Sequence, residues 1–171
     1  MAKFKHAPIA RHEALAPFSR DHYTGLVQAQ QMMKAADADD VERRKAVAEF
    51  VDAWDREIAE HFADEEKLLL SLMNSDDRQR LFDDHRRLAG MADQARQLRR
   101  QVDPAPDLLR QIGQALEAHI RWEERELFVR LQNELSQEQL ALLQHQTEPI
   151  EQARPRNTCR RGDHADEESP T

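Results

Sequence analysis

The stretch that decides the fold is residues 39–73, which read DDVERRKAVAEFVDAWDREIAEHFADEEKLLLSLM. Apolar residues recur in it every three or four positions, which is the period of an α-helix and not of a strand. Asp39, followed three positions later by Glu42, suits a capping box at the helix start. The side chains predicted to face inward are Val47, Phe50, Val51, Trp54, Ile58, Leu68 and Leu72. We therefore predict one helix that runs to about Met73.

The same period predicts helices elsewhere in the chain. They cover residues 19–36, the segment from the Asn74–Asp77 turn to about Gln101, and residues 107–135, with a short fifth helix over 137–146. Only four glycines occur in 171 residues, and no stretch alternates in the manner of a strand. Because short connections favour antiparallel neighbours, we predict an all-α fold, an up-down-up-down four-helix bundle.

The length of 171 residues is that of one ordinary domain. Residues 1–16 have little periodicity and are predicted to form an N-terminal arm on the body, with the first helix starting near Ser19. The bundle and the fifth helix then occupy residues 17–146. Prolines, arginine clusters and an acidic end predict a disordered tail over residues 147–171.

Charge and composition exclude several classes of function. The chain has 25 basic and 33 acidic residues, with a net charge of −8, so we expect neither a nucleic-acid nor an anionic-lipid partner. It lacks an apolar stretch of about 18 residues and the apolar core of a signal peptide, which predicts a cytoplasmic protein without a membrane partner. The single cysteine, Cys159, excludes an intramolecular disulfide and a cysteine-based zinc or iron–sulfur site within the chain.

Two copies of the spacing His-x-x-x-Glu lie on separate predicted helices. They are His61-Phe-Ala-Asp-Glu65 and His119-Ile-Arg-Trp-Glu123. Residues four apart on a helix share a face, so each pair can direct an imidazole and a carboxylate at one point. With 8 histidines and 33 acidic residues, ~1.5 such spacings are expected by chance, and a third copy does occur in the predicted tail at His164. The position of the two copies therefore matters more than their number.

Helix rise places most of the candidate histidines in one layer. His61 lies about 11 residues before the end of its helix and His85 about 9 after the start of the next, so both are ~15 Å from the same turn. His85 and His119 differ in depth by only ~5 Å. The match is worse for His22, which lies about 14 residues from its turn, whereas His61 lies about 21 residues from that turn.

Six polar residues interrupt the apolar stripes of these helices: His22, His61, Glu65, His85, His119 and Glu123. Burying them without partners would cost several kcal/mol for each buried ion, and a pair of bound cations would remove that cost. Nitrogen and oxygen donors favour iron or manganese, and zinc is also compatible with them. The alternative is that the pairs are solvated contacts on charged helices. The chain would then be a metal-free helical interaction or regulatory module.

Two further residues with oxygen donors lie near these positions in the sequence. Glu57 lies four residues before His61 and could supply an oxygen ligand or, alternatively, a surface salt bridge. Tyr23 adjoins His22, but it lies about 100° around the helix, away from the ligand face. It is expected to be a packing or surface residue.

The order of these motifs resembles that of a known family. They are Asp21-His22-Tyr23, His61-Phe-Ala-Asp-Glu65, Asp84-His85-Arg86 and His119-Ile-Arg-Trp-Glu123. In this order the chain resembles the hemerythrin-like family, whose domain is named for its His/His/Glu cation-binding pattern, over roughly residues 17–135. The resemblance implies two non-haem irons with an oxo or hydroxo bridge in a four-helix bundle. It further implies that His22 and His61 hold one iron, that His85 and His119 hold the other, and that Glu65 and Glu123 bridge them.

The sequence departs from the oxygen-carrying members of that family at two positions. Ala89 stands where a second histidine of the third helix is expected, and Glu123 lies four residues after His119, where those members use an aspartate five residues after. The missing imidazole implies a position open to a small ligand. We therefore expect a protein that reacts with or senses peroxide, O2 or NO, or that senses iron or redox state. Catalase-like breakdown of peroxide is the enzymatic form of this expectation.

Overall fold

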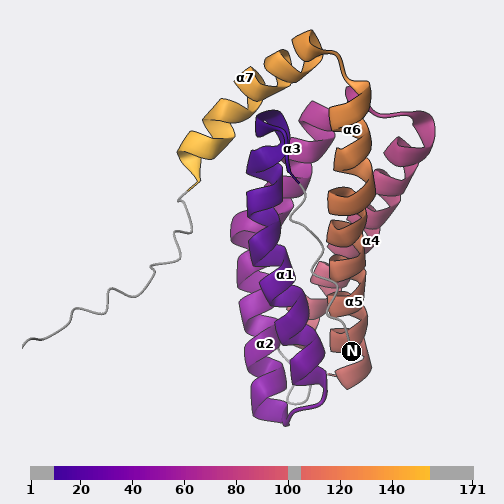
Figure 1. Ribbon diagram of the computed structural model, residues 1–171. Coiled ribbons are helices and arrows are strands. Elements are labelled where there is room, and N and C mark those ends of the chain that lie inside the picture. The colour runs from indigo at the N-terminus through magenta and orange to yellow at the C-terminus, as the bar shows by residue number, and fades with distance from the viewer. Residues whose placement is uncertain (1–9, 100–104, 155–171) are drawn as a thin grey trace, which may run out of the picture.

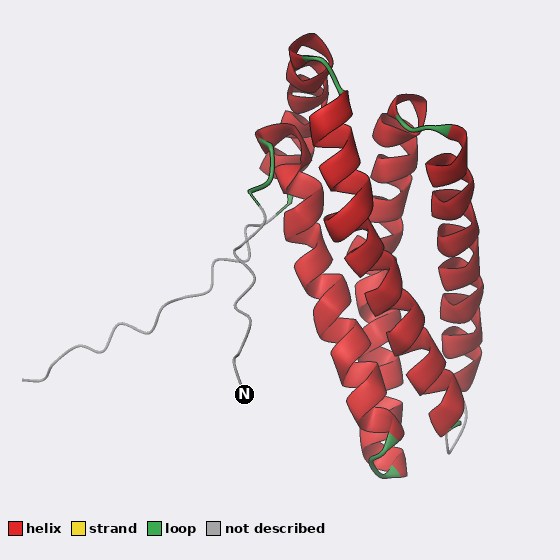
Figure 2. Cartoon of the chain, turned by 45° about the vertical axis from the view of Figure 1, so that its right-hand side comes forward, coloured by secondary structure: helices red, strands yellow, loops and turns green. Residues whose placement is uncertain are grey.

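The computed structural model describes residues 10–99 and 105–154, and all the regular structure in them is helical (Figure 1; Figure 2). The prediction of an all-α fold is thus confirmed for the described residues. The elements in chain order are η1 (Glu13–Leu15), α1 (Ala16–Ala36), α2 (Asp40–Ala53), η2 (Trp54–Ile58), α3 (Ala59–Leu69), η3 (Leu70–Leu72), α4 (Ser75–Leu98), α5 (Pro106–Trp122), η4 (Glu123–Leu127), α6 (Phe128–Glu134) and α7 (Gln137–Ala153).

Two of the long helices contain one wide turn each. The π-helical turn η2 joins α2 to α3, and the π-helical turn η4 joins α5 to α6. In each turn a backbone hydrogen bond joins residues five positions apart. In η2 the N–H of Ala59 donates to the carbonyl of Trp54, and in η4 the N–H of Phe128 donates to the carbonyl of Glu123. Such turns are rare and occur frequently at functional sites. Here η2 ends shortly before His61, and η4 begins at Glu123.

The long helices run alongside one another (Figure 1; Figure 2). α1 packs along α5 and α2, α2 packs on α4, and α4 packs on α5. The contact of α1 with α5 is very close at Gly113, where an added Cβ would lie 2.6 Å from the carbonyl oxygen of Ala29. These contacts join the four long helices in a ring, and the up-down-up-down topology stays a prediction.

Several helices start at the predicted polar residues. The side chain of Asp39 accepts a hydrogen bond from the N–H of Glu42 (2.9 Å), and Asn74 caps α4 in the same way through Asp77 (2.9 Å). The first helix differs from the prediction, because α1 begins at Ala16 and not near Ser19. Its first turn contains a proline, whose missing N–H would have no partner there in any case.

The last helix is longer than predicted. α7 continues to Ala153, so the prediction that the helix ends at 146 and a disordered tail begins at 147 is wrong for residues 147–153. Thr147 is buried, and its hydroxyl donates to the carbonyl oxygens of Ala14 (3.4 Å) and Gln144 (3.0 Å). Packing on η1 thus outweighs the helix-breaking tendency of Pro149. The predicted tail beyond Arg154, with Cys159, lies outside the described residues.

The buried apolar residues form two separate clusters. The first cluster contains Ala29, Phe50, Phe62, Leu88, Ile112, Leu116 and Ile120, among others. The second cluster contains Leu15, Phe18, Leu69, Leu81, Trp122, Phe128, Leu131, Leu140 and Leu143, among others. Each long helix passes from one cluster to the other at the position of its candidate ligands. A buried polar layer therefore divides the core.

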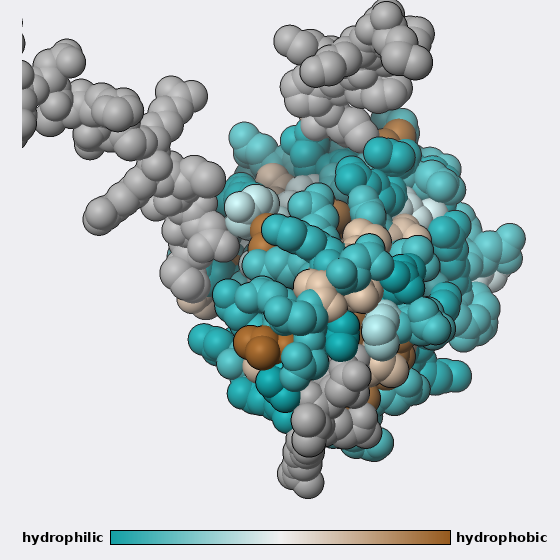
Figure 3. All heavy atoms as spheres, turned by 90° about the horizontal axis from the view of Figure 1, so that it is seen from below, coloured by the Kyte–Doolittle hydropathy of each residue, from teal (hydrophilic) through white to brown (hydrophobic). Residues whose placement is uncertain are grey.

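The outer surface is mainly polar. At the end of the molecule in Figure 3, hydrophilic side chains dominate and hydrophobic ones are scattered. Within the described ranges, no helix combines the length and apolar character needed to cross a membrane.

Candidate metal centre

All six predicted ligands meet in the polar layer. They come from four helices and the turn η4: His22 from α1, His61 and Glu65 from α3, His85 from α4, His119 from α5, and Glu123 at the start of η4. Each is buried, with at most 5% of its surface exposed. The i, i+4 spacing aligns each histidine with its glutamate, and helix packing brings the four elements together.

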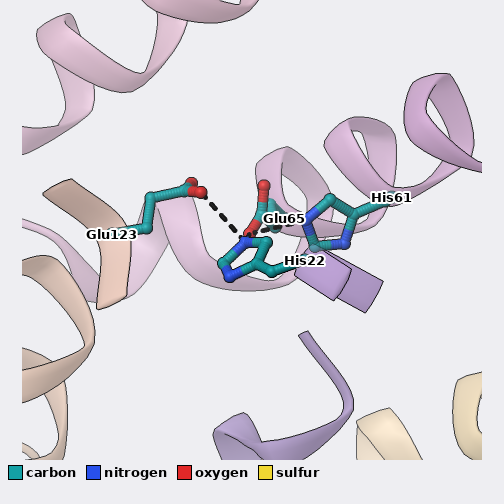
Figure 4. Close-up of side chains that lie close together, drawn as sticks. All are labelled: His22, His61, Glu65 and Glu123. Carbon is teal, nitrogen blue, oxygen red and sulfur yellow. Dashed lines mark ion pairs between the residues drawn. The ribbon is translucent and has the colours of Figure 1, made fainter. Parts of the chain in front are cut away.

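The six residues divide into two groups of four, and in each group the possible ligand atoms lie within 4.8 Å of one another. One group contains His22 and His61, the other contains His85 and His119, and both contain Glu65 and Glu123. In the first group, drawn in Figure 4, His22 Nε2 is 3.1 Å from Glu123 Oε2 and His61 Nε2 is 3.3 Å from Glu65 Oε1.

The second group has similar distances. His85 Nε2 is 3.5 Å from Glu65 Oε2, and His119 Nε2 is 3.3 Å from Glu123 Oε2. The two glutamates thus connect the groups, since each has oxygens close to histidines of both. This arrangement has the form of two adjacent cation positions with shared carboxylates.

The atoms that face the centre have no hydrogen bonds within the described part of the chain. This holds for Nε2 of all four histidines and for both oxygens of Glu65 and Glu123, all of which are buried. Buried polar atoms normally have partners, and leaving one without a partner costs about 1–3 kcal/mol. Imidazole nitrogens and carboxylate oxygens are common ligands of divalent cations. The residues present therefore fit a metal centre.

The opposite nitrogen of each ring faces an outer carboxylate. His22 Nδ1 is 2.7 Å from Glu124 and His85 Nδ1 is 2.8 Å from Glu66. His61 Nδ1 lies 3.5 Å from Asp21 Oδ2, and His119 Nδ1 lies 3.5 Å from Asp84 Oδ2. A carboxylate behind a metal-binding histidine fixes the tautomer and the orientation of the ring.

These outer carboxylates follow a repeated sequence pattern. Each half of the chain contains Asp-His on one helix and His-x-x-x-Glu-Glu on the next, at residues 21–22 with 61–66 and at residues 84–85 with 119–124. In every case the acid contacts a histidine of another helix. The sequence analysis used the Asp-His pairs only in the motif order, and it did not predict which histidine each acid contacts.

Burial and charge determine how the centre titrates without a cation. Burial lowers the pKa of His22 and of His85, but the surrounding carboxylates outweigh burial and raise both pKa values. Burial lowers the pKa of His61 below its ordinary value. Burial raises the pKa of Glu65, yet the electrostatic influence of His61 and contacts with His22 and His85 hold it well below its usual range. A cation must therefore displace protons from this site.

Two of the outer carboxylates stay ionised. Burial raises the pKa of Glu124, but contacts with His22, Ser19 and Arg11 outweigh it and lower the pKa to about 2. The contact with His119 lowers the pKa of Asp84, although burial opposes this shift. Both groups can therefore accept an N–H from the ring that they face at neutral pH.

Residues 18–131 match the family model described as the hemerythrin HHE cation binding domain. The chain belongs to this family. Comparisons with curated proteins and with solved structures found no significant match. The resemblance inferred from the motif order is thus confirmed, and all six candidate ligands lie inside the matched HHE domain.

Two histidines of the HHE domain stack on aromatic rings in nearly parallel planes. Phe62 stacks on His85, with ring centroids 3.9 Å apart and an interplanar angle of 6°. Phe128 stacks on His22 at 5.5 Å and 9°. These contacts fix the ring planes and exclude water from the sides of the centre.

Glu57 is not part of the centre. It is exposed and accepts a hydrogen bond from the hydroxyl of Thr24 (2.8 Å). The prediction that Glu57 shares the face of His61 assumed a regular α-helix, whereas the wide turn η2 changes the register there. Tyr23 is 57% exposed, as a surface residue is expected to be. Ala89 is also exposed, so α4 supplies no side-chain ligand one turn after His85.

The imperfect depth match of His22 and His61 also has a structural explanation. Their ring centroids are only 4.9 Å apart, although their distances from the α1–α2 connection differ by several residues. Side chains lean toward the N-terminus of their own helix. In the predicted up-down topology neighbouring helices would run in opposite directions, so their side chains would lean in opposite directions, which helix rise alone does not include.

Proposed function

We propose that the chain binds two cations, most naturally iron, between its four histidines, with Glu65 and Glu123 shared by both. The observation that carries this proposal is the set of eight buried atoms that face the centre without hydrogen bonds, namely Nε2 of each histidine and four carboxylate oxygens. Two carboxylates would offset half the charge of two divalent cations. The donor set is also compatible with manganese and zinc.

The proposed role is to react with or sense a small oxidant, namely peroxide, O2 or NO, or to sense iron or redox state. When bound, a pair of irons supplies electrons for such chemistry. The chain provides few ligands for two cations, and Ala89 provides none beside His85, which supports an open position for a small molecule. The two apolar clusters on either side of the layer would exclude bulk water from it.

The finer architecture belongs to the same proposal. We place α1, α2 with α3, α4, and α5 with α6 in an up-down-up-down four-helix bundle, followed by α7. The ring of packed helices and the short connections after α1 and before α4 support this topology. A cytoplasmic location, without a nucleic-acid or membrane partner, is part of the proposal and rests on composition.

Elemental analysis of protein purified from iron-supplied cells tests the metal assignment. The expected result is about two irons per chain, with an absorption band that disappears in chelator. Absence of metal, with helicity unchanged in chelator, would instead favour a metal-free helical interaction module.

A second measurement separates enzyme from sensor. Peroxide is added to the iron-loaded protein, and evolved oxygen and iron oxidation state are followed together. Oxygen evolution over many turnovers supports the catalase-like form. A change in oxidation state without oxygen release supports sensing.

A further inference from the structure

The segments that flank the matched HHE domain pack against each other. We call residues 10–17 and 132–154 the flanking segments. Figure 1 shows α7 lying across one end of the helices, beside the start of α1. Thr147 donates to the carbonyl of Ala14 (3.4 Å), and Gln144 donates to the carboxylate of Glu13 (3.0 Å). The buried members of this contact are Ala14, Leu15, Leu140 and Leu143, all in the second apolar cluster.

The N-terminal flanking segment holds one outer carboxylate through Arg11. The guanidinium of Arg11 donates to Glu124 Oε2 (2.5 Å), to the backbone carbonyl of Glu124 (2.7 Å) and to Ser19 Oγ (3.1 Å). The Arg11 side chain is only 8% exposed. The other oxygen of Glu124 contacts Nδ1 of His22. Arg11 therefore fixes the carboxylate that orients His22.

The C-terminal flanking segment holds a second outer carboxylate through Arg154. The guanidinium pairs with Asp21 and with Asp64, which joins the end of α7 to both α1 and α3. The same oxygen of Asp21 faces Nδ1 of His61 at 3.5 Å. Both histidines of the first group are thus backed by a carboxylate that an arginine from outside the HHE domain holds in place.

The His85/His119 group has no equivalent support. Glu66, behind His85, pairs with no lysine or arginine among residues 10–99 and 105–154. Asp84, behind His119, has a contact at 3.8 Å from Arg80, which lies one turn earlier on the same helix and is half exposed. Neither outer carboxylate of this group is tied to another segment of the chain by a basic residue.

We infer that Arg11 and Arg154 are positioning residues that make the two cation positions unequal, so that the His22/His61 position retains its cation and the His85/His119 position exchanges it. This inference rests on the proposed function, because it requires two bound cations. It assigns the flanking segments a role in metal retention, and it identifies the exchangeable position as the one where a small ligand enters.

The physical reason is the motion that releases a cation. A histidine must rotate its ring away from the metal, and this rotation breaks the contact between Nδ1 and the outer carboxylate. A carboxylate held by an arginine cannot follow the ring, because charge-assisted contacts fix its position. Outer carboxylates behind metal-binding histidines typically change metal affinity by about 10–100-fold. Loss of one arginine should therefore accelerate release from the first position by about 10-fold.

The test follows cobalt release from the full-length chain. Protein loaded with two equivalents of Co²⁺ is mixed with excess chelator, and the cobalt absorption is recorded over time. The wild-type protein should release cobalt in a fast and a slow phase. Arg11→Ala and Arg154→Ala should each accelerate the slow phase by about 10-fold and leave the fast phase unchanged, and Arg11→Lys should restore part of the retention.

Two control variants assign the phases. Glu66→Ala removes the carboxylate behind His85 and should accelerate only the fast phase. Arg20→Ala removes an ion pair between α1 and Glu151 of α7 without touching an outer carboxylate, so both phases should keep their wild-type rates. Far-UV circular dichroism reports whether each variant folds. If Arg11→Ala does not fold, Arg154→Ala and Arg11→Lys still decide the question.

The possible outcomes separate this inference from the proposed function. Release of both cobalt ions in a single phase, or equal acceleration of the two phases in Arg154→Ala, would overturn the inference alone. A slow phase that Arg20→Ala accelerates as much as Arg154→Ala would do the same, because general docking of α7 would then explain retention. Wild-type protein that binds no cation would overturn the proposed function, and the inference with it.

Discussion

The close contact between α1 and α5 predicts how the protein responds to one added methyl group at Gly113. A Cβ there would lie 2.6 Å from the carbonyl oxygen of Ala29 and 2.6 Å from the Cγ of Met33. The side chain of Met33 can turn aside, but the backbone at Ala29 cannot. Because heavy atoms pack at about 3.5 Å, α1 has to move by ~0.5–1 Å.

The magnitude follows from two opposing effects. Alanine is about 1 kcal/mol better than glycine inside a helix, whereas overpacking of a core contact costs about 1–3 kcal/mol or more. Because the obstructing atom is part of the backbone, the cost at Gly113 should lie at the upper end, about 2–3 kcal/mol. For Gly113→Ala we therefore expect a net loss of about 1–2 kcal/mol, or ~2–8 °C in unfolding temperature for a chain of this length. The variant should also bind metal more weakly, because α1 positions His22 and α5 positions His119.

Gly90→Ala is the matched control. Gly90 lies on the exposed side of α4, and apart from its chain neighbours and the nearby backbone of its own helix, no atom of the described residues is within 4 Å of an added Cβ. The same mutation there should stabilise the protein by about 0.5–1 kcal/mol. Urea unfolding monitored by far-UV circular dichroism measures both variants. If Gly113→Ala proves as stable as Gly90→Ala, the inferred close contact between α1 and α5 is wrong.

Substitutions near the centre and a change of pH test the ligand assignment. His119→Ala should lose most of the bound metal in elemental analysis, while the exposed His145→Ala keeps it, and equal retention would refute the assignment. Glu57→Gln should retain the wild-type metal content, because Glu57 is outside the centre. Loss of metal in this variant would show that Glu57 takes part in metal binding. In chelator, the fold raises the pKa of His22 above its ordinary value of 6.5, so protonation of His22 stabilises the folded chain. This stabilisation is complete below pH 6.5 and is lost as the pH rises through the raised pKa. The unfolding temperature should thus fall above pH 6.5 in chelator and not in metal-loaded protein, and parallel pH profiles would contradict the argument.

The helices and the pairing of candidate ligands along each helix were accessible from the sequence because both depend on local geometry. The i, i+4 spacing fixes which side chains share a face, so His61 pairs with Glu65 and His119 with Glu123 in any regular helix. The helical period likewise identifies most of the buried apolar residues. Phe50 and Trp54, for example, are buried as predicted.

The features that sequence reasoning missed depend on packing between elements. No local pattern in the sequence marks a π-helical turn, so the sequence does not predict the register change at η2 that excludes Glu57 from the centre. The end of α7 depends on the burial of Thr147 against η1, which outweighs the proline two residues later. The contacts of Arg11 and Arg154 join segments more than 80 residues apart and require the folded chain.

The polar layer that separates the two apolar clusters affects the cooperativity of the whole fold. An apolar core unfolds as one unit because its contacts are continuous, and here the continuity is interrupted where the candidate ligands meet. A bound cation would connect the four helices across that interruption. We therefore expect hydrogen exchange at the two ends of the molecule to be coupled in the loaded protein and independent after chelation. Occupancy of a buried centre would in this way become detectable at a distant surface, which is what a sensor requires.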